Sequence, residues 1–244
     1  IFTPYPYYYA WNKANEQDKV SNGVSSLFTM IKGAFAKESL LRVLRDFVFY
    51  PDDSKKSEAI VCRYPQFFGA NKMLENIKRH LRPEGDGKGG TYFGATGCGK
   101  TYTMLFLSRM IALRDPDAFN NPTIVIIVDR EDLDTQTSEL FVTATKYLHE
   151  SDVRSIESRK DMEQTLKDRP SGGVYITTIQ KFCESTGLLS DRSNIICISD
   201  EAHRTQTSTG SKLKKTDKGV FTTYGFICVR ASLMLLIVDL LAHQ

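Results

Sequence analysis

The sequence predicts an α/β fold in which helices flank a mostly parallel central sheet. Segments that favour strands alternate with segments that favour helices, and this alternation implies crossover connections between parallel strands. The run Thr-Ile-Val-Ile-Ile-Val at residues 123–128 has no charged residue, which is typical of a strand buried on both faces. With 244 residues, of which 41% are hydrophobic and 25% charged, the chain can bury one substantial core.

Residues 1–58 are predicted to form a helical extension and a linker ahead of the main domain. Apolar residues recur at spacings of three and four from Leu27 to Val48, which favours helices. The stretch 50–58 is polar and rich in turn-forming residues, so we expect a linker there. The chain opens without Met in an aromatic stretch, which suggests a piece of a longer protein.

The main domain is expected to span residues 59–226 and to alternate helices with strands. An amphipathic helix is predicted over residues 66–81, followed by a Gly-rich loop without regular structure over 83–90. The predicted strands are residues 91–93, 123–128, 174–177 and 194–199, and the predicted helices between them are residues 100–113 and 131–148.

A glycine-rich segment follows the first predicted strand. The sequence Gly94-Ala-Thr-Gly-Cys-Gly-Lys-Thr fits the P-loop pattern G-x-x-x-x-G-K-[ST]. Glycines allow successive backbone N–H groups to curl around a polyphosphate, and the helix N-terminus adds partial positive charge. Lys100 would reach the β- and γ-phosphates of ATP, and the Thr101 hydroxyl would hold Mg²⁺. The alternative is a plain turn before a capped helix. The candidate nucleotide-binding residues are Gly94, Gly97, Cys98, Gly99, Lys100 and Thr101.

The segment Ser199-Asp-Glu-Ala-His follows the last predicted strand. At the carboxyl edge of a parallel sheet, Asp200 would bind Mg²⁺, and Glu201 would orient and deprotonate the attacking water. Lys100, Asp200 and Glu201 are therefore the candidate catalytic residues. His203 lacks the H-E-x-x-H pattern or cysteine partners of a zinc site, so we interpret it as a coupling residue between nucleotide and nucleic acid.

Charge and cysteine content leave the partner open and favour a reducing compartment. The net charge of +3 neither requires nor excludes nucleic acid. The five cysteines are odd in number and lack C-x-x-C pairs, which fits the cytoplasm and predicts neither disulfides nor a zinc cluster. No apolar run reaches the roughly 18 residues of a membrane helix, and no signal peptide is recognised. We therefore expect no membrane partner.

The P-loop and the Asp-Glu-Ala-His segment together resemble the first RecA-like lobe of superfamily 2 DEAH-box helicases and translocases. Arg63-Tyr-Pro-Gln66 is similar to the glutamine motif of that superfamily, which implies that Gln66 reads adenine. A glutamine that merely starts a helix is the alternative. Residues 177–182 resemble a motif that touches the DNA backbone, so Thr177, Thr178 and Lys181 are candidate DNA ligands. An N-capped helix is the alternative there.

Within the superfamily, the motifs are most similar to the motor (R) subunit of type I restriction enzymes. The similarity lies in residues 46–50, 63–66, 130–136, 178–182 and 200–206 and covers most of residues 11–226. It implies ATP-driven translocation of double-stranded DNA, coupled elsewhere in the subunit to cleavage, in a complex with methyltransferase and specificity subunits. A lysine-rich stretch over 212–218 would add DNA contacts or is a solvated loop. The alternative functions are a catalytically inactive nucleotide-binding remnant and lobe 1 of another superfamily 2 motor.

Two parts that the resemblance implies are not found in the sequence. They are a nuclease domain with its D…E-x-K metal site and a second RecA-like lobe. We therefore expect half a motor, which alone hydrolyses ATP very slowly because no facing lobe stabilises the γ-phosphate in the transition state.

Residues 227–244 form an atypical tail. The family has a strand followed by Gly-Phe-Thr-Gly-Thr-Pro here. With suitable synonymous codons, the bases encoding residues 234–244 spell Asn-Ala-Thr-Tyr-Cys-Gly-Phe-Thr-Gly-Thr-Pro in another frame. We therefore expect a frameshift near residue 227, with a genuine amphipathic helix as the alternative. We expect the apolar tail to lie at the sheet edge as a poorly supported element.

Overall fold

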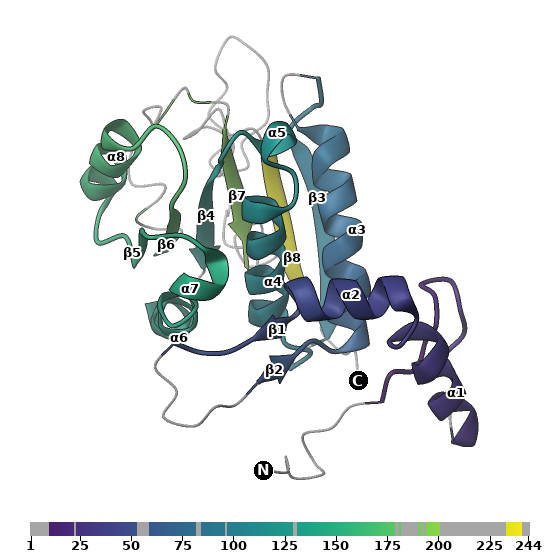
Figure 1. Cartoon of the computed structure of the whole chain (residues 1–244). Helices are drawn as coiled ribbons and strands as arrows, with labels where there is room; N and C mark the ends of the chain where they lie inside the picture. The colour runs from purple at the N-terminus through teal and green to yellow at the C-terminus, as the bar shows by residue number, and fades with distance from the viewer. Residues whose placement is uncertain are drawn as a thin grey trace.

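A parallel sheet organises the molecule (Figure 1). The computed structural model describes residues 10–21, 23–52, 59–81, 84–95, 97–128, 131–178, 181, 190, 192, 194–200 and 233–240. Within these residues the sheet has six strands, all paired in parallel. In spatial order they are β3 (Lys88–Ala95), β8 (Leu233–Leu240), β7 (Ile195–Ser199), β4 (Thr123–Val128), β6 (Val174–Thr178) and β5 (Val153–Ser155). The predicted α/β class with a parallel sheet is confirmed.

Helices lie against this sheet and at its corner (Figure 1). They are α1 (Val24–Gly33), α2 (Lys37–Asp46), α3 (Tyr64–His80), α4 (Lys100–Leu113), α5 (Pro116–Phe119), α6 (Glu131–Val142), α7 (Thr145–Leu148) and α8 (Arg159–Asp168). A short antiparallel pair, β1 (Val48–Phe49) and β2 (Ile60–Val61), joins the N-terminal helices to α3. None of the described helices is long and apolar enough to cross a membrane.

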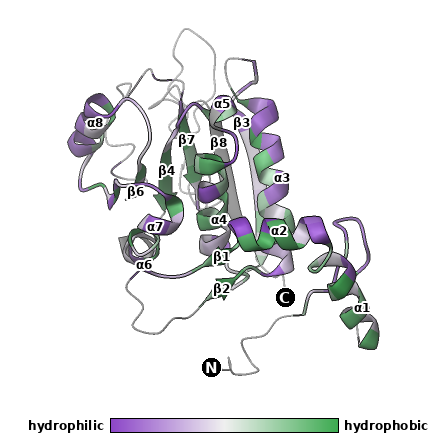
Figure 2. Cartoon of the chain, in the orientation of Figure 1, coloured by the Kyte–Doolittle hydropathy of each residue, from purple (hydrophilic) through white to green (hydrophobic). Residues whose placement is uncertain are grey.

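Strand β4 contributes side chains to a core on each face of the sheet. Ile124, Ile126 and Val128 belong to the larger apolar cluster, which also includes residues of α3 and α4. Val125 and Ile127 belong to a second cluster with residues of α8. Successive side chains of a strand point to opposite faces, so a strand without polar positions needs cover on both sides. The cover predicted from the apolar run is confirmed, and β4 and its neighbour β7 are drawn mainly in the hydrophobic colour (Figure 2).

Helix α4 is the central helix of the larger core. Met104, Leu105, Phe106 and Leu107 follow one another and are all fully buried. A helix that buries consecutive side chains must be covered on most of its surface. Helix α3 covers part of it and also contacts β3, so the helix that follows the P-loop is held on several sides.

The N-terminal extension shares this core. Trp11, Val43, Phe47 and Phe49 are buried in the same cluster as α3 and α4. The Phe47 ring lies 5.2 Å from that of Phe67. The helical periodicity from residue 27 is confirmed as two helices, α1 and α2. The two helices are separated by the short segment 34–36.

Two expectations about individual elements are wrong, and two further elements were not predicted. The segment 83–90 is not wholly irregular, because β3 already begins at Lys88 and pairs along its length with β8. The single helix over 131–148 is two helices, and the Thr143 hydroxyl between them donates to the carbonyl of Leu140 at 3.0 Å. Such side-chain bonds to the backbone compete with helical geometry. Strand β5 and helix α8 are the two elements that the sequence did not predict.

The C-terminal tail does not lie at the sheet edge. Strand β8 sits between β3 and β7 and pairs in parallel with both. A continuous apolar run suits an interior strand of a parallel sheet, which is covered on both faces. Residues 233–240 of the tail therefore form an inner strand rather than the expected edge element or a helix.

Candidate nucleotide-binding site

The P-loop occupies the turn between β3 and α4. Gly97 (φ 76°) and Gly99 (φ 82°) have left-handed backbone conformations, which glycine adopts without a steric penalty. The Cys98 N–H donates to the carbonyl of Ala95 at 3.0 Å, and Gly99 is the N-cap of α4. The loop therefore delivers the chain directly to a helix N-terminus, whose first N–H groups have no partner within the helix. Such an end of a helix is suited to bind an anion.

The start of α3 holds this loop from the side. The Gln66 amide nitrogen donates to the Gly99 carbonyl at 3.0 Å, and the Gln66 amide oxygen accepts from the backbone N–H of Arg63 at 2.7 Å. The Arg63 guanidinium donates to the carbonyl of Gly97 at 3.2 Å. Gln66 is 4% exposed. In this structure the amide binds the chain's own backbone, and adenine recognition by Gln66 stays a prediction.

Close approach of other atoms constrains two glycines, and one of them, Gly99, is also constrained by its conformation. A Cβ on Gly99 would collide with the amide nitrogen of Gln66. A Cβ on Gly94 would lie 2.7 Å from the Cys98 sulfur. Gly97 differs, because no atom lies within 4 Å of the position its Cβ would take. Gly99 is therefore needed for close packing and for its backbone conformation, Gly94 for close packing alone, and Gly97 for its conformation alone.

Lys100 and Thr101 form the first turn of α4, as predicted, and both are partly exposed. Thr103, four residues after Gly99, is fully buried. Its N–H and hydroxyl both donate to the Gly99 carbonyl, at 3.1 and 3.2 Å. Together with Gln66, Thr103 therefore fixes the orientation of the peptide that ends the P-loop.

Asp200 follows β7 and lies at the same carboxyl edge of the sheet as the P-loop. Asp200 is 7% exposed, and its N–H donates to the Ile127 carbonyl at 2.8 Å. Only β8 separates β7 from β3, so the two strands lie about 10 Å apart across the sheet, and β3 continues from Thr91, level with Ser199, to Ala95. One row of register crosses these strands through Thr91, Leu236, Ser199, Ile127 and Thr177.

The donor set at this edge fits Mg²⁺ in the presence of a polyphosphate. Magnesium prefers oxygen ligands and is held in nucleotide sites by one or two protein groups together with phosphates and water. The Thr101 hydroxyl and the Asp200 carboxylate are such groups, and both lie at the carboxyl edge of the sheet. Among the described residues, no cluster of three or more His, Cys, Asp or Glu side chains could hold a metal ion. The phosphates of a bound nucleotide would therefore supply the further ligands.

The candidate DNA ligands lie further along the same edge. Thr177 and Thr178 end β6 and are 0% and 1% exposed. The Thr178 hydroxyl accepts from the backbone N–H of Lys181 at 3.4 Å, the capping bond named above as the alternative. Lys181 is partly exposed. Contact of the two buried threonines with DNA stays a prediction.

Some predicted site residues cannot be placed. Glu201, His203 and the lysine-rich stretch 212–218 lie outside the described residues.

Sequence reasoning missed a tyrosine beneath the P-loop. The Tyr92 ring lies between α3 and the loop, since Cβ atoms on Gly69 and Gly94 would lie 2.7 and 3.3 Å from it. Burial, and to a lesser extent the nearby Cys98, raise the pKa of Tyr92 to about 12, against the effect of a hydrogen bond with Thr103. Only the P-loop pattern singled out Gly94, and no motif marks Tyr92, because its contact with α3 joins distant residues.

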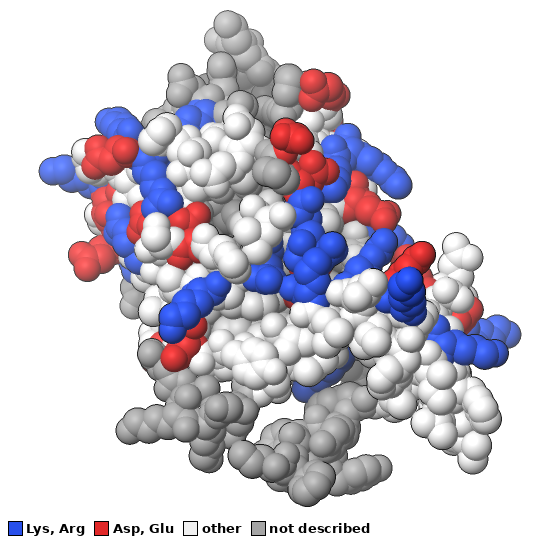
Figure 3. Space-filling view, viewed as in Figure 1, with Lys and Arg blue, Asp and Glu red and all other residues white. Residues whose placement is uncertain are grey.

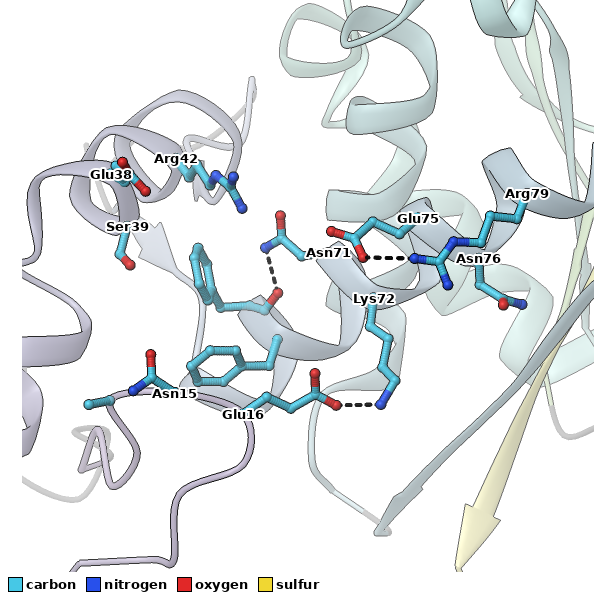
Figure 4. Close-up of a pocket in the computed structure, with 13 residues that line it drawn as sticks. Asn15, Glu16, Glu38, Ser39, Arg42, Asn71, Lys72, Glu75, Asn76 and Arg79 are labelled. Carbon is cyan, nitrogen blue, oxygen red and sulfur yellow. Dashed lines mark hydrogen bonds and ion pairs between the residues drawn. The ribbon is translucent and has the colours of Figure 1, made fainter.

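A hollow away from the P-loop lies between the extension and α3 (Figure 4). It encloses about 370 Å³ and is lined by residues 14–16, by one side of α2 and by one side of α3, including Phe67 and Phe68. Lys72 pairs with Glu16, and Arg79 lies 4.0 Å from Glu75. None of the described P-loop residues lines it. Acidic and basic side chains line this hollow in similar number. It is therefore a polar contact region between the extension and the lobe.

Comparison with known proteins agrees with the P-loop geometry. The SWI2/SNF2 ATPase family model matches residues 65–228. The type I restriction enzyme HindI endonuclease subunit of Haemophilus influenzae is 34% identical over 220 residues, which is 87% of this chain and 20% of that protein. The SauCOLORF180P endonuclease subunit of Staphylococcus aureus is 30% identical over 204 residues, 81% of this chain and 20% of that protein.

A shorter relative is matched over most of its own length. It is a Mycoplasma pneumoniae protein whose name assigns it to the C-terminal part of a type I restriction enzyme endonuclease subunit. It is 30% identical over 182 residues, 70% of this chain and 83% of that protein. This chain spans only about a fifth of the two longer relatives. On this evidence the chain belongs to the SWI2/SNF2 ATPase family and is a relative of type I restriction enzyme endonuclease subunits.

Proposed function

We propose that the chain is the ATP-binding motor lobe of an ATP-dependent double-stranded DNA translocase, within a type I restriction endonuclease subunit. The observation that carries the proposal is the pair of left-handed glycines between β3 and α4, with only β8 between β3 and β7, the strand that Asp200 follows. The SWI2/SNF2 match supports ATP use, and the names of the relatives support the restriction complex.

The proposed roles of Lys100, Thr101 and Asp200 suit their positions at the carboxyl edge of the sheet, and those of Glu201 and His203 come from the resemblance of their motif. Backbone N–H groups of the P-loop and the first turn of α4 bind the β- and γ-phosphates, and Lys100 neutralises their charge. Thr101 and Asp200 would hold Mg²⁺, which would supply positive charge beside the phosphates. Glu201 orients and deprotonates the attacking water, and His203 couples the nucleotide to DNA.

DNA and protein partners form the finer part of the proposal. Lys181, and after rearrangement Thr177 and Thr178, would contact phosphates of double-stranded DNA at the edge of the sheet. Methyltransferase and specificity subunits would be the protein partners. We also propose that residues 1–58, 59–226 and 227–244 are the extension, the motor lobe and a frameshifted tail. On this proposal the groups that complete hydrolysis lie in parts of the subunit outside this chain.

Nucleotide binding is the first test. A fluorescent ATP analogue is titrated with Mg²⁺ into the chain, into Lys100→Ala and into Lys160→Ala, a control at an exposed lysine of α8. We expect Lys100→Ala to weaken binding at least about tenfold, because it removes a charge-assisted hydrogen bond, and Lys160→Ala to leave it unchanged. Equal binding by the Lys100→Ala and unaltered chains would refute the P-loop proposal.

Turnover is the second test. ATP hydrolysis is measured with and without double-stranded DNA, for this chain and for an intact related endonuclease subunit. We expect DNA to stimulate the intact subunit and this chain to turn over very slowly. Fast DNA-stimulated hydrolysis by this chain alone would contradict the half-motor proposal while leaving nucleotide binding intact.

A further inference from the structure

The start of α3 (residues 63–68) contacts both the P-loop and the N-terminal extension. The Gln66 amide donates to the Gly99 carbonyl at 3.0 Å. The Arg63 guanidinium donates to the Gly97 carbonyl at 3.2 Å. The next side chain after Gln66, the Phe67 ring, is 5% exposed and packs against aromatic rings of the extension. Because protein interiors are close-packed, a shift of the Phe67 ring also moves the neighbouring amide that holds the loop.

Trp11 of the extension packs against three aromatic rings at the start of α3. The centroid of its indole lies 5.5 Å from that of Phe67, 6.3 Å from that of Phe68 and 6.5 Å from that of Tyr64. The indole nitrogen also lies close to the end of α1, since a Cβ on Gly33 would be 2.7 Å from it. The indole is therefore packed between the end of α1 and the start of α3, and Trp11 is 9% exposed.

Packing rather than polar contact holds the indole in this position. Within the described part of the chain, the buried indole nitrogen of Trp11 has no hydrogen-bond partner. Lys72 and Glu16 form an ion pair between α3 and the extension, but their side chains are 69% and 50% exposed, and such pairs contribute little to stability. In the space-filling view, basic and acidic side chains lie side by side on the surface over α2 and α3 (Figure 3). The contact between the extension and the start of α3 therefore depends mainly on the buried rings.

A second aromatic residue of the extension joins α3 to the helix that follows the P-loop. Phe47 is fully buried, and its ring centroid lies 5.2 Å from that of Phe67 and 5.3 Å from that of Phe106 on α4. Gly99, the last glycine of the P-loop, is the N-cap of α4. The extension thus packs against both helices that hold the loop, and Trp11 packs against the one whose side chains bind it.

We propose that Trp11 is a positioning residue for the nucleotide site. The indole holds the start of α3 where the Gln66 amide can bind the Gly99 carbonyl. Because a trans peptide is planar, fixing this carbonyl also fixes the direction of the Lys100 N–H, one of the groups proposed to bind phosphate. By linkage, a nucleotide that orders the loop also tightens the contact between α3 and Trp11. The inference rests on the proposed binding of ATP at the P-loop and gives the extension a part in it.

The first test compares variants of the full 244-residue chain in the titration with the fluorescent ATP analogue. We expect Trp11→Ala to weaken binding by roughly three- to thirtyfold, because the start of α3 loses its support. Trp11→Phe keeps a ring against Phe67 and should keep most of the affinity. Met162→Ala is the control, since Met162 is 1% exposed in the core cluster on the other face of the sheet. It should destabilise the chain in urea without changing the affinity.

The second test needs no nucleotide. Hydrogen exchange of the backbone amides at residues 97–101 is measured in the same variants under conditions where all are folded. We expect Trp11→Ala to speed exchange in this segment, and Trp11→Phe and Met162→Ala to leave it close to that of the unaltered chain. This measurement separates the two proposals. A chain that binds no ATP would refute the proposed function, whereas unchanged exchange in Trp11→Ala would refute the positioning role of Trp11.

The third test uses the unaltered chain, because Trp11 is its only tryptophan. Indole emission is followed while ATP and Mg²⁺ are added. We expect a saturating change with the dissociation constant found by competition against the analogue, and no change in Lys100→Ala. Constant emission while the analogue binds would overturn the inference, as would equal losses of affinity in Trp11→Ala and Met162→Ala. The emission measurement stays decisive if Trp11→Ala does not fold.

Discussion

Gly99 combines two constraints at a single residue: a left-handed φ of 82° and contact with the Gln66 amide. A left-handed conformation costs a residue with a Cβ about 1–2 kcal/mol. We expect Gly99→Ala to lose that amount and also to push Gln66 away, which breaks the bond from Gln66 to the loop. Urea unfolding should report a destabilisation above about 2 kcal/mol, and ATP-analogue binding should be lost.

Two other glycines are matched controls for this variant. Gly97 and Gly23 have φ values of 76° and 65°, and no atom lies within 4 Å of their Cβ positions. Gly97→Ala should cost only the conformational term and weaken nucleotide binding. Gly23→Ala should cost a similar amount of stability with no effect on binding. If Gly99→Ala behaves like Gly23→Ala, the packing of Gln66 against the loop has no functional weight.

Asp46 is the second residue at which a specific energy is expected. It is 1% exposed, accepts from the Arg114 Nε at 2.6 Å, and pairs with Arg45 at 3.0 Å. Removing one partner of a buried ion pair typically costs about 3–5 kcal/mol, because the other charge stays buried. We expect Asp46→Ala to lower the free energy of unfolding by about that amount, measured by urea denaturation.

Arg45→Ala is the comparison for Asp46→Ala. The Arg45 side chain is 54% exposed, and its removal leaves Asp46 paired with Arg114. An exposed pair contributes at most about 1 kcal/mol. A similar loss in both variants would mean that Asp46 does not tie the extension to α4.

Local patterns account for the site residues that the sequence predicted. Gly97, Gly99, Lys100 and Thr101 belong to one short motif, whose spacing alone places them at a helix start. Arg63, Tyr92 and Thr103 were missed as parts of the site. Arg63 and Tyr92 reach the loop from other elements, and a contact between distant residues leaves no periodic signal. Thr103 carries no signal in the sequence, because helical threonines commonly donate their hydroxyl to the carbonyl four residues earlier, as Thr29 does to Ser25.

At the scale of elements, the burial of a strand decides how well the sequence predicts it. Strand β4 was predicted with its observed bounds, because every residue is buried and apolar or β-branched. Strand β5 has three residues, too few to establish a pattern. Helix α8 is strongly polar and buries few side chains, which left little apolar periodicity. Strand β3 begins with Lys-Gly-Gly, which disfavours strands, and its pairing with β8 prevails over that local preference.

Strand β8 gives a prediction about an element. It is the strand neighbour of β3, and β3 carries the P-loop. Ending the chain at residue 232 should leave both β3 and β7 with unpaired backbone groups along the former contact. We expect the 1–232 chain to lose its cooperative unfolding transition and ATP-analogue binding. The 1–240 chain is the control and should keep both. Normal folding of the 1–232 chain would show that the sheet does not depend on β8.

The coding DNA tests whether β8 arose by a frameshift. The frameshift expectation stays a prediction, because an apolar run fills an interior strand position in whichever frame it arose. Sequencing the gene should show that the codons of residues 234–244 spell Gly-Phe-Thr-Gly-Thr-Pro in the shifted frame. Codons that do not spell this segment would contradict the frameshift and leave β8 as a native strand.

At the scale of the whole molecule, burial of neutral titratable groups predicts how stability depends on pH. Burial raises the pKa of Cys62 from 9.0 to about 12 and, as the largest cause, that of Tyr92 from 10.0 to about 12. Burial also raises the pKa values of Tyr147 and Tyr175. All four groups are neutral when protonated, so the folded state holds these protons more tightly than the unfolded state does. Their contribution to stability is therefore complete below about pH 9 and is lost as the pH rises toward 12.

Urea unfolding at pH 7.5, 9, 10 and 11 measures this dependence. We expect the free energy of unfolding to fall with increasing slope above about pH 9, because each titrating group adds one proton to the difference between the two states. Cys62→Ala removes one group and should flatten the decline between pH 9 and 10 more than Tyr92→Phe does, because in this range the unfolded cysteine is mostly ionised and an unfolded tyrosine is at most half ionised. Tyr92→Phe should flatten it mainly above pH 10. If neither variant changes the slope, Cys62 and Tyr92 are not the source of the alkaline instability. The part of the core beside the P-loop would then unfold before these two groups ionise.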